Sequence, residues 1–527
     1  MNGTMEVLVD KRTDSLVLKA LDPFALRDLI PQTKTLNHPD YNVAVHHTLD
    51  ATRVLRNLGY TVPAPIRHQY DWPGRFQPYE HQIEMCEFLT MHRKCFNLSE
   101  MGTMKTNATL WAADWLMKTG RVRKALIGSP LSTLEPVWAN DIFDTLPHRT
   151  SAVLHGDKAR RMKYLAIDAD FYIINHDGFK IAEMLTALIK RPDIDLLVID
   201  EAGMFRNPSS AKYKALAKLI NARPDMRVWL MTGTPCPNAP TDAWGLARLI
   251  DPTRVPKFAG AFQRDTMMKV SAFKWVARVD AYEKAYQAMQ PAIRFKKRDC
   301  ISLPPVVTRD IGAPITPAQA ATVKQLKDHM VTTGGNGTKI VAANVADQIN
   351  KMRQVLCGAL KDPSTGNYYP IPHGPRLQAL LDAIASASAK VIVVVPFKGI
   401  IRLLEQEVTK AGYTCETVNG DVPMGKRTEI FTRFKKEKDP HVILCHPAVM
   451  AHGLNLTEAD VLVFYAPIYS NDEVEQVNER FNRAGQTRNM TIVRIGAHPL
   501  EWAIYKMTDT KAQSQNSILE LYEAAVH

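Results

Sequence analysis

A lysine and a threonine at the start of a predicted helix are the first residues whose types and spacing indicate chemistry. The segment CFNLSEMGTMKTNATLWAADWLMKTG has the pattern of a strand, a loop and a helix, with Lys105 and Thr106 at the loop-to-helix junction and Gly120 where the helix would stop. Backbone N–H groups at a helix N-terminus attract phosphate, a lysine reaches the β and γ phosphates, and a threonine hydroxyl binds Mg²⁺. Because the segment lacks the usual GxxxxGK[ST] spacing, an ordinary loop is the better interpretation of this segment taken alone.

Two adjacent acids change that balance. The apolar run DLLVIDEAG predicts a buried strand that presents Asp200 and Glu201 at its carboxyl end, where α/β proteins place their ligands. Asp200 could hold Mg²⁺, and Glu201 could orient and deprotonate the water that attacks a phosphoryl group. A solvated acidic turn is the alternative interpretation.

A third apolar strand, in VWLMTGTPCPN, ends in small hydroxylated residues. Thr232, Gly233, Thr234 and Pro235 could link a nucleotide site to a second ligand, or could form a simple turn. This motif is informative through its order and spacing after the two acids.

Near the C-terminal end, NDEVEQVNERFNRAGQ places polar residues at helical spacing. Gln476, Arg480 and Arg483 could share one helix face, with Gln486 following them. Arginines can stabilise the charge that spreads over a transferring γ-phosphate. A solvated helix face is the alternative, which the order of all the motifs disfavours.

These residues need strands that end beside one another. Short apolar runs alternate with helical segments from about Phe76 onward, which predicts the α/β class with parallel sheets. The expected strands form two groups and so two sheets. In the first group they end near Pro130, His176, Ala202 and Pro235; in the second, near Pro396, Pro447, Pro467 and Ala497.

The expected organisation has four parts. Residues 1–75 form a small N-terminal α+β module, 76–255 a first lobe, 256–374 a helical spacer, and 375–527 a second lobe with a C-terminal helical brace. The length of 527 residues agrees with two or three domains.

Composition limits the classes of function. Sixty-six Lys and Arg against 54 Asp and Glu give a net charge of +12, which suits nucleic acid but also fits a merely basic protein. The seven cysteines show no zinc-ligand spacing and are expected to be reduced thiols in a cytoplasm. No apolar run is long enough for a membrane span, and no membrane role is expected.

Taken together, the motifs resemble the Swi/Snf-type branch of superfamily-two helicases, over about 77–521. QPYEHQ resembles the adenine-reading motif, SEMGTMKT resembles DEMGLGKT, DEAG resembles DEAH, TGTP resembles motif three, GLNL resembles motif five, and QVNERFNRAGQ resembles QxxxRxxRxGQ of motif six. The resemblance implies two RecA-like domains with ATP bound between them.

The resemblance also assigns roles to individual residues. The implied ATP-contacting residues are Gln82 for the base, and Gly102, Lys105, Thr106 and Gly453. The implied catalytic residues are Lys105, Asp200, Glu201, Gln476 and two arginine fingers, Arg480 and Arg483, with Mg²⁺ on Thr106 and Asp200. The implied nucleic-acid contacts are Pro130, Thr232, Thr234 and Asn455.

Two residues depart from the family pattern. Met104 stands where the family has Gly, and its side chain could crowd the phosphate or strain the backbone. Gly203 replaces the family's His, which removes a link between the acids and motif three. We therefore expect slow turnover or weakened coupling, but an active ATPase.

The expected function is an ATP-dependent DNA translocase or helicase that acts on duplex, forked or branched DNA in replication, recombination or repair. The run LGYTVPAPIRHQYDWPGRFQPYEHQ is similar to the N-terminal module of HARP-like annealing helicases, or merely braces the first lobe. We expect a bacterial or phage-encoded monomer acting in the cytoplasm. The alternatives are an RNA-directed ATPase and a nucleic-acid-binding scaffold with a decayed ATPase site.

Overall fold

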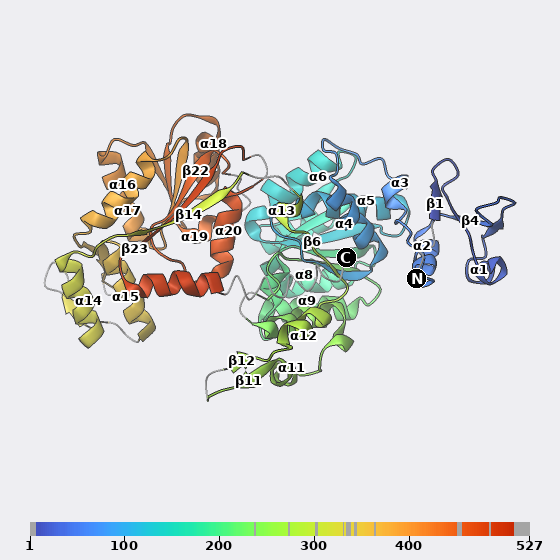
Figure 1. The fold of residues 1–527 in the computed structure, drawn as a ribbon, viewed down its shortest axis with the longest axis horizontal. Coiled ribbons are helices and arrows are strands. Elements are labelled where there is room, and N and C mark those ends of the chain that lie inside the picture. Colours follow the sequence, from blue (N-terminus) through green and yellow to red (C-terminus); the bar gives the residue numbers. More distant parts are fainter. Residues whose placement is uncertain are drawn as a thin grey trace. The chain divides into compact units, whose positions relative to one another are not determined.

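The computed structural model describes residues 7–236, 239–271, 275–300, 304–329, 331–333, 339–341, 345–362, 365–450, 456–483 and 486–510. The described residues divide into two units, the first ending at Cys300 and the second comprising those from 304 to 510. Each unit is built on one parallel sheet, and the first also carries a small antiparallel sheet near its N-terminus (Figure 1). This confirms the predicted fold class. No helix in the described ranges is long and apolar enough to cross a membrane.

The small N-terminal module is a four-stranded antiparallel sheet with short helices, drawn in dark blue in Figure 1. Its elements are β1 (Val7–Asp10), β2 (Ser15–Leu18), α1 (Pro23–Leu29), β3 (Lys34–Thr35), β4 (Val43–His46), α2 (Leu49–Asn57) and α3 (Ile66–Gln69). Helix α2 faces the rest of the first unit, where the Arg53 guanidinium donates to the Met91 carbonyl and Arg121 pairs with Asp50.

The first parallel sheet has seven strands in the order β13-β5-β10-β9-β6-β8-β7. The strands are β5 (Lys94–Asn97), β6 (Lys124–Ser129), β7 (Ser151–Leu154), β8 (Phe171–Asn175), β9 (Ile194–Ile199), β10 (Arg227–Met231) and β13 (Ala292–Ile293). The helices are α4 (Glu80–Met91), α5 (Lys105–Lys118), α6 (Asn140–Thr145), α7 (Lys158–Leu165), α8 (Ala182–Ile189), α9 (Ala211–Ala222), α10 (Ala243–Ile250), α11 (Ala259–Thr266), α12 (Ala281–Ala288) and α13 (Lys297–Cys300).

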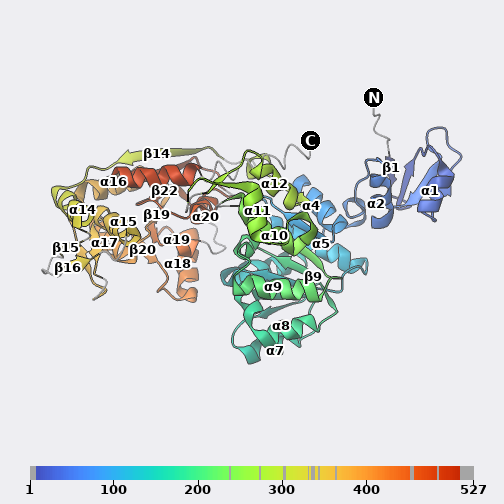
Figure 2. The same ribbon diagram turned by 90° about the horizontal axis from the view of Figure 1, so that it is seen from below.

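Strand side chains alternate between two buried layers, which is why both faces of this sheet carry helices. In β9, Leu196 and Val198 pack in one core with residues of α4, α5 and α6. Leu197 and Ile199 pack in the other core with residues of α8, α9, α10 and α12. Figure 2 shows α8 and α9 on the side of the sheet away from α4 and α5.

The second parallel sheet has six strands in the order β14-β23-β22-β19-β21-β20. The strands are β14 (Val306–Gly312), β19 (Lys390–Val394), β20 (Cys415–Val418), β21 (Val442–Cys445), β22 (Ala459–Phe464) and β23 (Met490–Gly496). The helices are α14 (Pro317–His329), α15 (Val345–Leu356), α16 (Gly374–Ala385), α17 (Lys398–Lys410), α18 (Met424–Lys436), α19 (Pro447–Met450) and α20 (Asn471–Phe481), followed by a helix over 499–510.

The second sheet is covered in the same way. Val391 and Val393 of β19 pack with α16 and α17, and Ile392 and Val394 pack with α18 and α20. A buried ion pair, Arg376 to Glu501 at 2.6 Å, ties α16 to the C-terminal helix.

The predicted helical spacer over 256–374 differs from the structure, which divides this segment between the two units. Strand β13 joins the first sheet and β14 joins the second. The described residues of the segment also form three two-stranded antiparallel sheets: β11 (Met267–Lys269) with β12 (Trp275–Ala277), β15 (Val331–Thr333) with β16 (Lys339–Val341), and β17 (Ala359–Lys361) with β18 (Tyr368–Pro370). The sequence pattern missed β13 and β14 because their partners are distant in the chain.

Candidate active site

The loop between β5 and α5 forms a tight turn before the helix begins at Lys105. Gly102 has φ 82° and Met104 has φ 57°, so both lie in the left-handed region. Met104 is the N-cap of α5, and its side chain has no oxygen that could accept a hydrogen bond from the first amides of the helix. The first helical amides, near Lys105 and Thr106, therefore form the kind of helix terminus that receives a phosphate.

The side chain of Lys105 folds back onto backbone carbonyls earlier in the same loop. The ammonium of Lys105 donates to the carbonyl oxygen of Ser99 at 2.5 Å and to that of Glu100 at 3.1 Å. The side chain of Thr103 also donates to the Glu100 carbonyl, at 2.8 Å. To reach a nucleotide phosphate, the Lys105 ammonium would have to exchange these carbonyls for phosphate oxygens.

Helix α4 supports the loop from the other side. The Gln82 side chain is 2% exposed; its amide donates to the Met104 carbonyl at 3.2 Å and accepts from the Tyr79 N–H at 3.0 Å. His81 Nε2 lies 3.1 Å from the Thr103 carbonyl oxygen. The predicted base-reading residue is thus placed against the phosphate loop, with both ends of its amide bonded to backbone.

The two predicted acids lie directly after β9. The Asp200 N–H donates to the Gly128 carbonyl at 2.8 Å, which extends the sheet by one bond. Asp200 Oδ2 accepts from the indole N–H of Trp138 at 3.1 Å, and Oδ1 accepts from the Glu201 N–H at 3.0 Å. Glu201 has φ 48°, so the backbone turns sharply at this residue. Its side chain thereby leaves the line of the strand.

A buried histidine supports these acids. His176 Nε2 lies 2.9 Å from the Asp200 carbonyl oxygen, and its ring meets Phe205 edge-on at 4.9 Å between centroids. Since a carbonyl only accepts, Nε2 carries the proton. Burial lowers the pKa of His176 to about 4. His176 is therefore neutral at pH 7 and acts as a hydrogen-bond donor behind the acids.

The third motif lies between the other two because β10 lies between β5 and β9. The Thr232 N–H donates to the Asn97 carbonyl at 3.0 Å, and the Thr234 N–H to Thr232 Oγ1 at 3.2 Å. A Cβ added at Gly233 would meet the Met101 backbone nitrogen at 3.3 Å, and one at Gly203 would meet the Thr234 carbonyl at 3.4 Å. The three loops thus form one contiguous surface at the carboxyl edge of the sheet.

Pro130 extends this edge beyond the acids. It follows β6, the strand next to β9, and its carbonyl accepts from the N–H and hydroxyl of Thr133 at 3.1 and 3.0 Å. Leu131 beside it is 48% exposed. The turn therefore leaves an apolar side chain at the surface.

The second unit confirms the predicted spacing of motif six only in part. Gln476 and Arg480 lie four residues apart in α20 and share a face, but the helix ends at Phe481, so the prediction that Arg483 lies on that face is wrong. Beyond the helix, the Gln486 amide is buried; it donates to the Ala459 carbonyl at 2.9 Å and accepts from the N–H groups of the next two residues.

Motif five lies mostly outside the described residues. This holds for the predicted Gly453 and Asn455. The first described residue after them is Leu456, whose N–H donates to the Arg480 carbonyl at 3.3 Å. The end of motif five therefore contacts the motif six helix through backbone.

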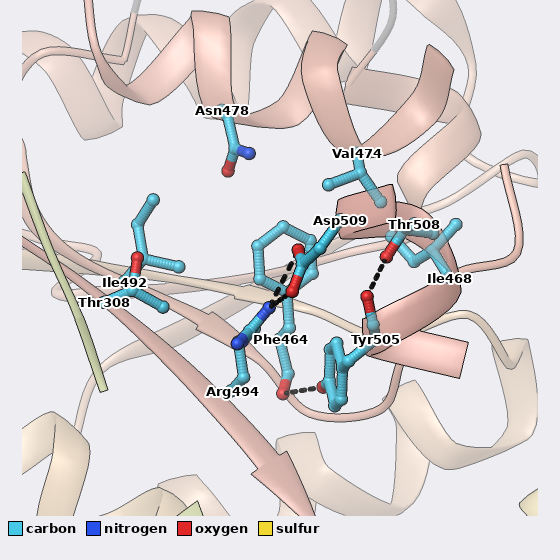
Figure 3. A pocket seen from close by; sticks show the side chains of 10 residues that line it. All are labelled: Thr308, Phe464, Ile468, Val474, Asn478, Ile492, Arg494, Tyr505, Thr508 and Asp509. Atoms are coloured by element: carbon cyan, nitrogen blue, oxygen red, sulfur yellow. Dashed lines mark hydrogen bonds and ion pairs between the residues drawn. The ribbon is translucent and has the colours of Figure 1, made fainter. Parts of the chain in front are cut away.

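The second unit also contains a pocket of about 110 Å³ that is separate from the predicted residues (Figure 3). Val474 and Asn478 line it from α20, so it lies on the helix face opposite Gln476 and Arg480. Arg494 lies in its wall and pairs with Asp310 and Asp509. The pocket belongs to the packing between the sheet and the C-terminal helix.

The structure adds two residues that the motifs did not single out, Trp138 and His176. Both touch Asp200, but through long-range contacts, 62 and 24 residues apart in the chain. The one available signal for His176 was its place at the end of the FYIINH strand, beside the predicted acids. Trp138 carried no signal in the sequence.

Comparison with known proteins shows the family to which this chain belongs. A family model described as the SNF2-related domain matches residues 81–359, more than half of the chain. The chain belongs to the SNF2-related family. A second model, the helicase conserved C-terminal domain, matches residues 375–485. The two models together match most of this SNF2-related chain.

The relatives of this SNF2-related chain differ widely in length. Protein CHROMATIN REMODELING 4 of Arabidopsis thaliana is 22% identical over 79% of the chain, which spans 20% of that protein. Protein p41 of Acyrthosiphon pisum secondary endosymbiont phage 1 is 24% identical over 84% of the chain and 98% of that protein. The Sulfolobus solfataricus SWI2/SNF2 ATPase core, solved with dsDNA, is 19% identical with a TM-score of 0.40, over 85% of this chain and 94% of that one.

Proposed function

We propose that this SNF2-related chain is an ATP-driven motor that moves along or remodels DNA. One observation carries the proposal: the loops after β5, β10 and β9 contact one another and bring Lys105 and the Asp200–Glu201 pair to the same edge of one sheet. That edge is where open α/β sheets bind ligands. The combination of a lysine, a helix N-terminus and two acids is suited to phosphoryl transfer.

The residues at this edge fit a nucleotide with Mg²⁺. The start of α5 offers amides without a side-chain cap, and Asp200 and Thr106 have the carboxylate and hydroxyl oxygens that Mg²⁺ prefers as ligands. Mg²⁺ would neutralise charge on the phosphates. Lys105 would hold the outer phosphates, and Gly102, in the left-handed region, would let the backbone approach them.

Glu201 is proposed as the general base for the attacking water. The turn at φ 48° sets its side chain apart from Asp200, whose two carboxylate oxygens are already held by Trp138 and by the Glu201 N–H. The turn supports separate roles for the two side chains, with Asp200 toward the metal and Glu201 toward water. Gln82 would act on the base only after exchanging its bond to the Met104 carbonyl.

The remaining roles are proposed for the second unit and for the DNA contacts. Gln476 and Arg480 share a face of α20, and Arg483 follows the helix. Through the family motif, Arg480 and Arg483 are assigned as candidate arginine fingers. Gly453 is assigned to ATP and Asn455 to DNA through the family motif. Pro130, Thr232 and Thr234 are assigned to the DNA backbone, because they lie at the same edge as the ATP residues.

DNA is proposed as the partner because of the net charge of +12 and because a solved SWI2/SNF2 core is described in complex with dsDNA. Contacts to phosphate would make the affinity fall steeply with salt and depend little on sequence. We place the activity in replication, recombination or repair, in the cytoplasm of the cell or host, with the chain acting as a monomer.

ATP hydrolysis by the wild type and two variants would test this function. Lys105→Ala removes the phosphate-binding ammonium, and Glu201→Gln removes the proposed base while keeping its shape. Lys118→Ala, in the same helix, and Glu183→Gln, an exposed acid on α8, serve as matched controls. Each protein would be assayed without nucleic acid, with duplex DNA, with forked DNA and with RNA.

We expect duplex or forked DNA to stimulate ATP turnover by the wild type and both controls. In the two site variants the rate of ATP hydrolysis should fall by a factor of at least about 100. Stimulation by RNA instead of DNA would favour the RNA-directed ATPase. Absence of ATP turnover under every condition, with DNA binding intact, would contradict the proposed motor. It would favour a nucleic-acid-binding scaffold with a decayed ATPase site.

A further inference from the structure

The chain segment that leads toward the second unit is bonded to the phosphate loop. Strand β13 lies at the edge of the first sheet beside β5, and unit 1 ends a few residues later at Cys300. The N–H groups of Phe96, Leu98 and Glu100 donate to the carbonyls of Pro291, Ile293 and Phe295 at 3.0, 2.8 and 3.0 Å. The pairing therefore continues past the end of β5 at Asn97 and into the loop itself.

A buried arginine reinforces this pairing. The Arg294 side chain is 1% exposed; its guanidinium donates to the Leu98 carbonyl at 3.0 Å and to Glu100 Oε1 at 2.9 Å. Glu100 Oε2 accepts from the Lys297 N–H at 2.9 Å. An arginine keeps its charge when it is buried, so a carboxylate partner is needed. Glu100 supplies that partner from within the phosphate loop.

Glu100 also contacts the residues of the ATP site through its backbone. Its carbonyl accepts from the Lys105 ammonium, so this one residue joins the proposed phosphate-binding lysine to Arg294. The hydroxyl of Ser99, whose carbonyl also accepts from Lys105, receives the Phe295 N–H at 3.1 Å. A shift of residues 293–297 would therefore move both carbonyls that hold Lys105.

We infer that Arg294 and Glu100 are positioning residues for ATP: they fix the phosphate loop and couple it to the chain segment that leads to the second unit. This inference rests on the proposed ATPase function and deepens it. Neither side chain needs to touch the nucleotide. The pair acts through the Ser99 and Glu100 carbonyls and through the start of α5.

The test compares conservative variants with a matched control in the full chain. Arg294→Lys keeps the charge but loses the fork that reaches the carbonyl and the carboxylate together. Glu100→Gln keeps the shape and the backbone carbonyl but loses the charge. Arg223→Lys is the control, because Arg223 is also buried and also donates to a carbonyl, that of Arg191, and to a carboxylate, that of Asp225. It lies away from the phosphate loop, next to β10.

The measurements are KM and kcat for ATP hydrolysis, the Kd of a fluorescent ADP analogue, and the melting temperature. We expect Arg294→Lys to raise both KM and Kd about tenfold, which is the effect of losing one charged hydrogen bond. The change in kcat should be smaller. Glu100→Gln should raise KM and Kd by less than Arg294→Lys does. Arg223→Lys should lower the melting temperature to a similar degree but leave KM and Kd within about twofold of the wild type.

Two failures are distinguishable. If the wild type hydrolyses ATP but Arg294→Lys changes only the melting temperature, as the control does, Arg294 is structural and the inference is overturned. If the wild type itself neither binds nor hydrolyses ATP, the proposed function fails, and the positioning role fails with it.

Discussion

Replacing Met104 with glycine and, separately, with alanine would test the left-handed turn before α5. Both variants lose the methionine side chain, so the loss of its packing cancels between them. Alanine keeps the left-handed cost of about 1–2 kcal/mol, which glycine does not have. Glycine gains about 0.5–1 kcal/mol of extra chain entropy on unfolding. With φ at 57°, the two effects leave a difference of about 0–1.5 kcal/mol, so the glycine variant should be the more stable by about 0.75 kcal/mol, the mid-value.

The assay is urea unfolding of both variants together with ATP turnover at saturating ATP. Asp14 is the matched control, because it has φ 47° and lies in an exposed turn of the N-terminal module. Its glycine variant should also be more stable than its alanine variant, but turnover should be equal in the two. At Met104 the alanine variant should also turn over ATP more slowly than the glycine variant, because the strain that alanine keeps in the left-handed region favours loop conformations in which Lys105 is displaced. Greater stability of alanine at Met104, as is usual elsewhere in proteins, would refute a left-handed Met104.

Three further predictions concern groups around the site and in the second core. Because the pKa of His176 is about 4 when folded and near 6.5 when unfolded, protonation favours the unfolded chain, so stability should fall as the pH is lowered from 6.5 toward 4. His176→Gln should reduce the loss of unfolding free energy between pH 7 and pH 5 by about 2 kcal/mol in urea titrations. An unchanged loss of unfolding free energy would exclude His176 as its source. Gly203→Ala should raise stability by about 0.4–1 kcal/mol without slowing ATP turnover, since its Cβ would meet the Thr234 carbonyl at an acceptable 3.4 Å; a destabilised protein would show that this turn needs glycine. Arg376→Met should destabilise the second unit by about 3–5 kcal/mol by leaving Glu501 buried without its partner, and adding Glu501→Leu should recover much of this; equal losses in the single and double variants would contradict the argument.

Much of the local structure followed from the chain alone. The eight predicted strands of the two parallel sheets are present, and α5 begins at Lys105 as expected. These elements depend on apolar runs and on helix boundaries, which are properties of neighbouring residues. The same local rule failed after Phe481, where α20 ends although the spacing of polar residues continues to Arg483. Farther along, the Gln486 amide is buried and donates to the Ala459 carbonyl of β22, a tertiary contact that helical periodicity does not describe.

The sequence by itself determined the types and order of the chemical groups: the Lys105 loop, the Asp200–Glu201 pair and the polar residues of α20. Only the tertiary structure decided which backbone and side-chain groups hold them, because several of those contacts join residues far apart in the chain. The Arg294–Glu100 pair spans 194 positions, and His176 meets Asp200 across two neighbouring loops. The strand order β5-β10-β9 brings the three motifs together, and strand order follows from the packing of whole sheets and helices, not from any local pattern.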